Sequence, residues 1–292
     1  MTDSPTDEND KKRPLAQDEP TPITLEGEMP QKRFYRSRAH CNPLSHNDAF
    51  EYPLKPTEMD WTLHFSNAKP PTVLDVGCGF GGLTVALSNL LPEEQILAME
   101  IRAKVTEYVR LRIVALRKDH PGQYQNASVM RTNSMKYLPH YCQPASLRKI
   151  FFCFPDPQFK KKNWGRRIVS ERLLTEYAYL LQEGGKLYCI TDVLELHKWH
   201  VAKCNAHPLF ECISDTTDDP CVATMQTATE ESQKVDRAGA SKYFAVYRRI
   251  SNNQVPLLTT IEDFFPEEED DDEESEEKPT DESEEKPAST AS

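Results

Sequence analysis

The chain has 292 residues, with 47 acidic side chains against 35 basic ones and a formal net charge of −12. This length suits one large domain or two small ones, and the overall charge taken alone argues against nucleic acid as a partner. The charge is unevenly spread, because residues 262–292 hold 16 acids and two lysines, and residues 1–30 hold eight acids and three bases. Residues 31–261 therefore carry +7, which suits an anionic partner.

Both ends are predicted to be disordered, because they are acidic and too poor in apolar residues to offset the entropy of ordering. Residues 1–30 and 262–292 are thus tails around one domain at 31–261. The eight cysteines include no C-x-x-C pair, which indicates reduced intracellular thiols and no structural zinc. We expect neither secretion nor a membrane span. Lys11-Lys12-Arg13-Pro14 fits a nuclear import signal, and equally a solvated basic run.

Short apolar strands alternate with amphipathic helices along the middle of the chain. The strands are expected at 72–77, 95–100, 126–131, 149–154, 186–191 and 243–249. The helices are expected at 102–119, at 171–182 between Ser170 and a Gly184-Gly185 stop, and from Asp192 to about Ala206. This alternation predicts an α/β fold, a mostly parallel sheet with helices on both faces. Ligands of such sheets bind at the carboxyl ends of the strands.

A glycine-rich loop follows the first expected strand. Gly77, Gly79 and Gly82 fit the pattern G-x-G-x-x-G, and Glu100 ends the next expected strand, where an acid would chelate a ribose diol. The pattern therefore predicts a nucleotide-like cofactor, although a tight strand-to-helix turn that binds nothing would also use such glycines.

Asp75 favours a methyl donor over a dinucleotide at this loop. A dinucleotide lays its pyrophosphate across such a turn, where a carboxylate two residues before the first glycine would repel it. S-adenosylmethionine brings a sulfonium and an ammonium group instead, which an acid attracts. Asp75 could also be a residue that fastens the loop through hydrogen bonds to the backbone.

The fourth expected strand runs into Pro155-Asp156-Pro157. The prolines fix the backbone around Asp156 and remove N–H donors, so this acid should lie on a rigid loop at the carboxyl edge of the sheet. A plain turn is the alternative. Two clusters of basic and aromatic residues suit RNA, because cations neutralise phosphates and rings stack on bases. Their basic members are Lys32, Arg33, Arg36, Arg38, Lys160, Lys161, Lys162, Arg166 and Arg167.

Several long motifs in order resemble the eukaryotic tRNA (guanine-N7-)-methyltransferase catalytic subunits, over roughly residues 31–250. They are the segments 31–36, 38–40, 60–61, 75–82, 100–102, 152–160, 191–197 and 229–231. The resemblance implies a seven-stranded Rossmann-like methyltransferase that methylates N7 of a guanosine in the tRNA variable loop. It also implies a heterodimer with a non-catalytic WD-repeat β-propeller. The expected location is the nucleus, with the cytoplasm as a further possibility.

Residue roles follow from the same resemblance. Asp156 is the implied active-site acid, and the implied S-adenosylmethionine residues are Gly77, Gly79, Glu100, Ile101, Arg102, Asn133, Ser134, Cys153, Thr229 and Glu231. The chain departs from the family at three positions. Family members usually have Ser where this chain has Cys41, and many have Leu in place of Cys153 and His in place of Gln158. Neither a metal nor a membrane is implied. Two other readings stay open: an NAD-type oxidoreductase on the same glycine loop, and a non-catalytic RNA-binding scaffold.

Overall fold

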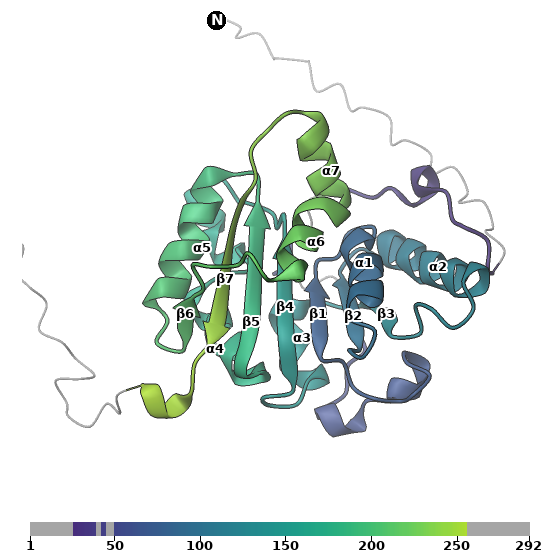
Figure 1. Ribbon diagram of the computed structural model, residues 1–292, viewed down its shortest axis with the longest axis horizontal. Helices are drawn as coiled ribbons and strands as arrows, with labels where there is room; N and C mark the ends of the chain where they lie inside the picture. The colour runs from purple at the N-terminus through teal and green to yellow at the C-terminus, as the bar shows by residue number, and fades with distance from the viewer. Residues whose placement is uncertain (1–25, 39–41, 45–49, 256–292) are drawn as a thin grey trace, which may run out of the picture. The chain divides into compact units, whose positions relative to one another are not determined.

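A seven-stranded sheet lies at the centre of the described residues, which are 26–38, 42–44 and 50–255 of this computed structural model. The strands are β1 (Val73–Val76), β2 (Ile96–Glu100), β3 (Ala127–Arg131), β4 (Leu147–Cys153), β5 (Leu181–Thr191), β6 (Phe210–Cys212) and β7 (Tyr243–Arg249). Their order is β3-β2-β1-β4-β5-β7-β6 (Figure 1). The strands from β1 to β5 pair in parallel, and β7 runs antiparallel to β5 and β6.

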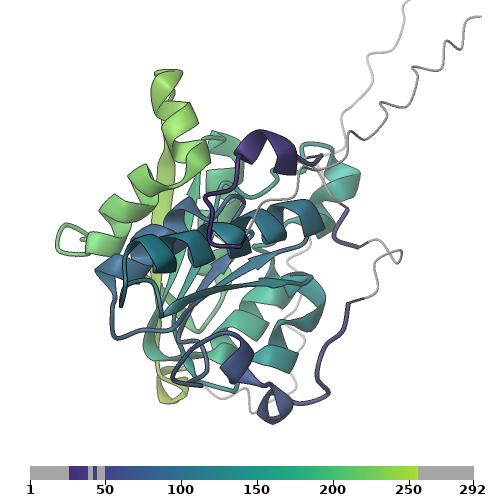
Figure 2. The same ribbon diagram turned by 90° about the vertical axis from the view of Figure 1, so that its right-hand side faces the viewer.

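Helices cover both faces of the sheet (Figure 2). One face carries α1 (Gly82–Leu90), α2 (Ala103–Asp119) and α6 (Pro220–Ala228), and the other carries α3 (Ser134–Tyr141), α4 (Glu171–Leu180) and α5 (Leu194–Ala206). Central strands are apolar throughout because alternate side chains enter opposite layers. In β4, Phe151 stacks on Tyr188 at 4.3 Å on the α1 face, while Ile150 and Phe152 pack on the α4 face. No helix among the described residues is long and apolar enough to cross a membrane.

The expected mostly parallel α/β sheet is confirmed, as are all six expected strands and three helices to within a few residues, except where β5 begins. The strand missed by the sequence analysis, β6, has only three residues, two of them exposed. The prediction that Gly184-Gly185 ends the helix at 171–182 is wrong. The helix α4 already ends at Leu180, and both glycines lie inside β5.

These glycines form an irregularity in the pairing of β4 and β5. Leu147 pairs with Leu181 and Lys149 with Lys186, so β5 carries extra residues at this point. Gly184 has a φ of +78°, which both helix ends and bulges use, and its position inside β5 identifies the bulge. Local sequence does not separate these two uses of glycine.

The expected tails and Cys41 lie outside the described residues, apart from residues 26–30. There Glu26 lies 3.4 Å from Arg110 on α2.

The connection between α6 and α7 (Glu230–Arg237) lies directly against the start of α1. A Cβ atom on Gly82 would collide with the Ala228 carbonyl oxygen and lie 2.8 Å from Glu230 Oε2. The third glycine of the motif is therefore required by the approach of another backbone, independently of any ligand.

We predict that Gly82→Ala destabilises the fold by about 1 to 3 kcal/mol, the usual cost of overpacking. Urea unfolding of the full chain measures it. Gly165→Ala is the matched control, because a Cβ there would meet nothing within 4 Å. Equal stability of both variants would show that α6 and α7 move aside without cost.

Candidate functional site

Two adjoining cavities open at the carboxyl ends of the central strands. The first, of about 210 Å³, is bordered by the ends of β1 to β4, and the second, of about 440 Å³, by the glycine loop, the ends of β4 and β5, and the start of α7. Their shared lining consists of Gly77, Arg102, Cys153, Phe154, Pro155 and Asp156. The first cavity also holds Glu100, Ile101, Asn133 and Ser134, and the second Gly79, Thr229 and Glu231. The structure thus brings together every predicted catalytic and cofactor residue.

The glycine loop begins where β1 ends. Gly77 has a φ of +75°, a conformation that favours glycine, and its N–H donates to the Met99 carbonyl at 2.8 Å. A Cβ on Gly77 would meet nothing within 4 Å, so this side of the backbone faces open space. Gly77 therefore lets a ligand come close to the main chain.

Asp75 lies beneath this loop, 1% exposed, and accepts a hydrogen bond from the Thr84 hydroxyl at 2.6 Å. Burial raises the pKa of this carboxyl to about 7, and the neighbouring acids Glu230 and Glu100 contribute in the same direction. Asp75 does fasten β1 to α1, as one of the two sequence interpretations had it. It also borders the second cavity, where a cation would favour its charged form.

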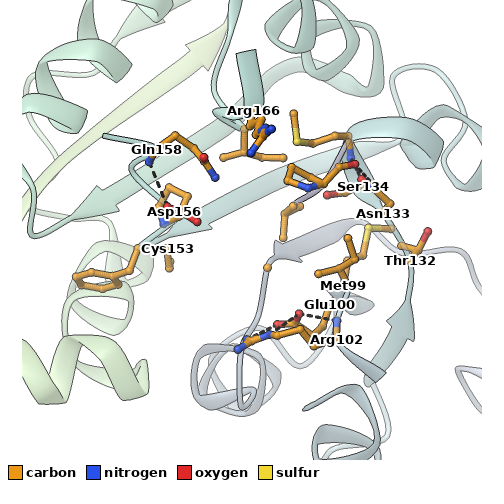
Figure 3. A pocket seen from close by; sticks show the side chains of 18 residues that line it. Met99, Glu100, Arg102, Thr132, Asn133, Ser134, Cys153, Asp156, Gln158 and Arg166 are labelled. Atoms are coloured by element: carbon orange, nitrogen blue, oxygen red, sulfur yellow. Dashed lines mark hydrogen bonds and ion pairs between the residues drawn. The ribbon is translucent and has the colours of Figure 1, made fainter. Parts of the chain in front are cut away.

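Glu100 ends β2 with its carboxylate held by Arg102 (Figure 3). The Arg102 Nε and backbone N–H donate to Oε1 at 3.0 and 2.9 Å, and Nη2 donates to Oε2 at 2.8 Å. Oε1 thus accepts two hydrogen bonds, whereas Oε2 accepts one and keeps further acceptor capacity. The pair therefore presents an oriented acceptor that suits a sugar diol.

Asn133 and Ser134 follow β3 and start α3. Asn133 caps this helix by accepting from Met135 N–H at 3.1 Å, and its amide donates to the Pro43 carbonyl. Asn133 therefore fixes this wall of the first cavity, since both ends of its side chain are engaged. Across the cavity, burial raises the pKa of the Cys153 thiol well above its usual value, so it stays protonated.

The Pro155-Asp156-Pro157 loop is bounded by two strained residues. Phe154 and Gln158 have φ values of +51° and +49°, a region that costs non-glycine residues about 1 to 3 kcal/mol each. Asp156 Oδ1 accepts from the Gln158 N–H at 3.1 Å (Figure 3). Such strain persists only where the surroundings enforce it, and it is common at functional sites, so this loop is a candidate functional element.

The start of α7 closes the second cavity. Thr229 is its N-cap and accepts from Ser232 N–H at 2.9 Å, whereas Glu231 is largely exposed and pairs with Lys234. Glu230, to which the sequence analysis gave no separate role, accepts from the Gly82 N–H at 3.2 Å and from Arg112 at 2.8 Å. It ties α7 to the glycine loop. Because Glu230 meets residues over 100 positions away, local pattern carries no signal for it.

The predicted RNA-binding residues differ in exposure. Lys160, Lys161 and Lys162 are exposed, as are Arg33, Arg36 and Arg38, and Arg166 borders the first cavity. Lys32 lies 4.2 Å over the ring of Phe80 in the glycine loop.

Arg167 does not match its prediction as a surface cation. It is 2% exposed, with its guanidinium against the rings of both Trp164 and Trp199. Two large rings adjoin it in the fold, which a basic run in the sequence does not reveal.

Asp192 is a further acid that the sequence analysis assigned only to a helix start. It follows β5 and borders the second cavity with Asp156, whereas α5 begins at Leu194. Its position directly after a strand was the available signal.

Among the described residues, no group of three or more His, Cys, Asp or Glu side chains could hold a metal. Burial lowers the pKa of His200 to about 3, so this residue is neutral.

Comparisons with known proteins show which family the chain belongs to. A family model described as "Putative methyltransferase" matches residues 69–245. A tRNA (guanine-N(7)-)-methyltransferase of Eremothecium gossypii is 50% identical over 241 residues, which cover 78% of this chain and 85% of that protein. Proteins of the same name from Oryza sativa subsp. indica and Arabidopsis thaliana are 50% and 49% identical, covering 77% and 76% of this chain and 93% of each relative.

The sheet, the glycine loop, the acid that ends β2 and the family model together define an S-adenosylmethionine-dependent methyltransferase with a Rossmann-like fold. The comparisons take the assignment one step further: the chain belongs to the tRNA (guanine-N(7)-)-methyltransferase family. An oxidoreductase on the same glycine loop is thereby set aside.

We predict that S-adenosylmethionine binding releases a proton from Asp75. The folded-state pKa of about 7 means that the carboxyl is mostly protonated below that pH, and a nearby cation favours the carboxylate. Affinity should rise with pH up to about 7 and then level off. Calorimetry near pH 6 in two buffers of different ionisation enthalpy measures the release. Asp75→Asn should abolish it, and equal enthalpies for the unsubstituted protein in both buffers would contradict the prediction.

Proposed function

We propose that the chain transfers a methyl group from S-adenosylmethionine to N7 of a guanosine in the variable loop of tRNA. Family membership, with relatives about half identical over most of their length, carries the activity. The observation that supports its location is the shared lining of the two cavities at Asp156. A donor with its nucleoside in the first cavity and its methionine end at the glycine loop would present its methyl group beside that loop.

The first cavity suits the nucleoside part of the donor. Glu100 offers an oriented carboxylate to the ribose, and Ile101, Asn133 and Ser134 border the space left for the adenine. Asp75 offers negative charge on the side of the glycine loop. S-adenosylmethionine supplies an electrophilic methyl group on a positively charged sulfur.

Asp156 is proposed to orient the guanine. Guanine N7 carries an in-plane lone pair and no proton, so its methylation needs no general base. Alignment of the reacting atoms is the main requirement, and positioning can contribute up to about 7 to 11 kcal/mol. A carboxylate on a rigid loop suits the N1–H and N2–H donors of the guanine edge, which would turn N7 toward the donor.

Labelled S-adenosylmethionine incubated with total tRNA, followed by nucleoside analysis, tests the function. We expect label only in 7-methylguanosine and only in the variable loop. Label in another nucleoside would contradict the proposal.

We predict that Asp156→Ala lowers kcat/KM for tRNA by at least 100-fold and leaves the affinity for S-adenosylmethionine within about threefold. The physical reason is that the carboxylate would contact the guanine and not the donor. Asp215→Ala, at an exposed acid outside both cavities, is the control. If calorimetry shows cofactor binding falling in parallel with turnover, Asp156 is instead a cofactor or structural residue.

The exposed cations beside the cavities are proposed to hold the tRNA backbone. Lys160, Lys161 and Lys162 follow the Asp156 loop directly, and Phe159 next to them is 66% exposed, so it could stack on a base. Lys32, Arg33, Arg36, Arg38 and Arg166 are the further proposed contacts. Arg167 is left out, because its charge is buried.

We predict that replacing all three lysines by Gln reduces the slope of log K against log salt by about two to three units, since each phosphate contact contributes slightly less than one. Filter binding of tRNA over a salt series measures the slope. Lys69→Gln is the control, at an exposed lysine before β1, on the opposite edge of the sheet. An unchanged slope in the triple variant would identify the run as a solvated loop.

The proposed working form is a nuclear heterodimer with a WD-repeat β-propeller. Support comes from the resemblance and from the charge of only +7 over residues 31–261, which gives one subunit a limited electrostatic hold on tRNA. The candidate import signal at Lys11 to Pro14 lies outside the described residues.

We predict slower single-turnover methylation and weaker tRNA binding by the isolated chain than by the chain co-expressed with the propeller, both at saturating cofactor. The reason is the phosphate-binding surface that a partner would add. Equal rates and affinities would mean that the chain acts alone.

A further inference from the structure

Arg167 is the largest fully buried side chain among the described residues, and it is charged. Its guanidinium carbon lies 4.7 Å from the ring centre of Trp164 and 4.6 Å from that of Trp199. Trp199, on α5, is itself fixed, because its Nε1–H donates to the Val169 carbonyl at 2.7 Å. A buried cation is costly unless it is paired and hydrogen-bonded, so the polar contacts of Arg167 are needed to keep it in this position.

Two polar contacts hold this guanidinium. Nη2 lies 3.3 Å from Glu195 Oε1, whose side chain is mostly exposed. The Nε–H donates to the carbonyl oxygen of Pro157 at 3.0 Å. Pro157 is the residue directly after Asp156, so a rigid side chain at the end of η4 (Lys161–Arg166) is bonded to the loop that carries the proposed guanine contact.

That loop needs an external restraint. The strained φ angles at Phe154 and Gln158 would relax if the backbone between them were released. Pro155 and Pro157 have no N–H, so the loop supplies few bonds of its own. Among the hydrogen bonds of the described residues, the Arg167 contact restrains its second half from outside, as Phe154 N–H donating to the Ile190 carbonyl at 2.8 Å restrains its start.

We propose that Arg167 is a positioning residue, whose Nε–H holds the Pro157 carbonyl and so sets the direction of the Asp156 carboxylate. The inference rests on the proposed role of Asp156 in orienting guanine. A phosphate contact is disfavoured, because the guanidinium would have to leave both tryptophan rings to reach one.

Arg167→Lys is the decisive variant. Lysine keeps a cation beside the two rings and near Glu195, but it lacks the Nε–H donor directed at Pro157. We expect single-turnover methylation of tRNA about 10- to 100-fold slower than in the unsubstituted protein, because small displacements at a reacting site are amplified in the rate. Cofactor affinity should stay within about twofold, and the salt slope of tRNA binding should not change.

Arg148→Lys is the matched control. This arginine is exposed, pairs with Glu94 and lies at the amino end of β4, away from both cavities, so its rate should equal that of the unsubstituted protein. An Arg167→Lys protein that methylates at the unsubstituted rate overturns the proposal. A salt slope of tRNA binding reduced by about one unit in Arg167→Gln, which removes the charge, also overturns it, by making Arg167 a phosphate contact.

A double-mutant cycle with Asp156→Ala separates positioning from general stability. If Arg167 acts through Asp156, Arg167→Lys should slow the Asp156→Ala protein by less than about twofold, whereas independent effects would multiply.

Should Arg167→Lys not fold, Trp199→Phe provides the second variant, since it keeps an aromatic face and loses the bond to Val169. We expect a several-fold slower rate with unchanged cofactor affinity, and the unsubstituted rate would count against the proposal. Absence of methylation by the unsubstituted protein co-expressed with the propeller would instead refute the proposed function.

Discussion

Parallel pairing of β1 with β2 on one side and with β4 on the other determines where the whole site lies. The strand order reverses at β1, so the loops after β1 and β4 leave in different directions and open a crevice at the carboxyl edge. Glycine, carboxylate and proline residues follow these strands directly, and none needs a long connection to reach the crevice. The side chains that line the site therefore come mainly from the few residues after each strand.

Residues far away in the sequence complete that crevice. Glu230 joins α7 to the first turn of α1 and to Arg112 on α2, and Arg167 joins the Asp156 loop to α5. Glu230 fixes the glycine loop, and Arg167 fixes the loop that carries Asp156. A methyl transfer that depends on the alignment of the reacting atoms needs both loops in a defined relative position. This requirement explains why two charged side chains make structural contacts close to the site.

The sequence predicted those parts whose signal is local. Gly77, Glu100 and Asp156 each directly follow or end an apolar strand, so periodicity and spacing locate them. The burial of Arg167 and the bridge made by Glu230 could not be predicted, since they arise from the packing of α5 and α7 against distant loops. The end of α4 was missed because Gly184 serves a bulge rather than a stop. The individual roles of the cofactor and RNA residues remain predictions.

The composition of the loop after β4 restricts what it can bind. Of residues 155–157 only Asp156 has a backbone N–H, so the segment is rich in acceptors and poor in donors. It cannot form the cluster of amide donors that captures phosphate at many nucleotide sites. A tRNA backbone would find no anchor there, whereas a base edge rich in N–H groups would. In the proposed complex the two prolines would thus favour the N–H-bearing edge of a nucleobase at the reacting centre and leave the phosphates to the lysines outside.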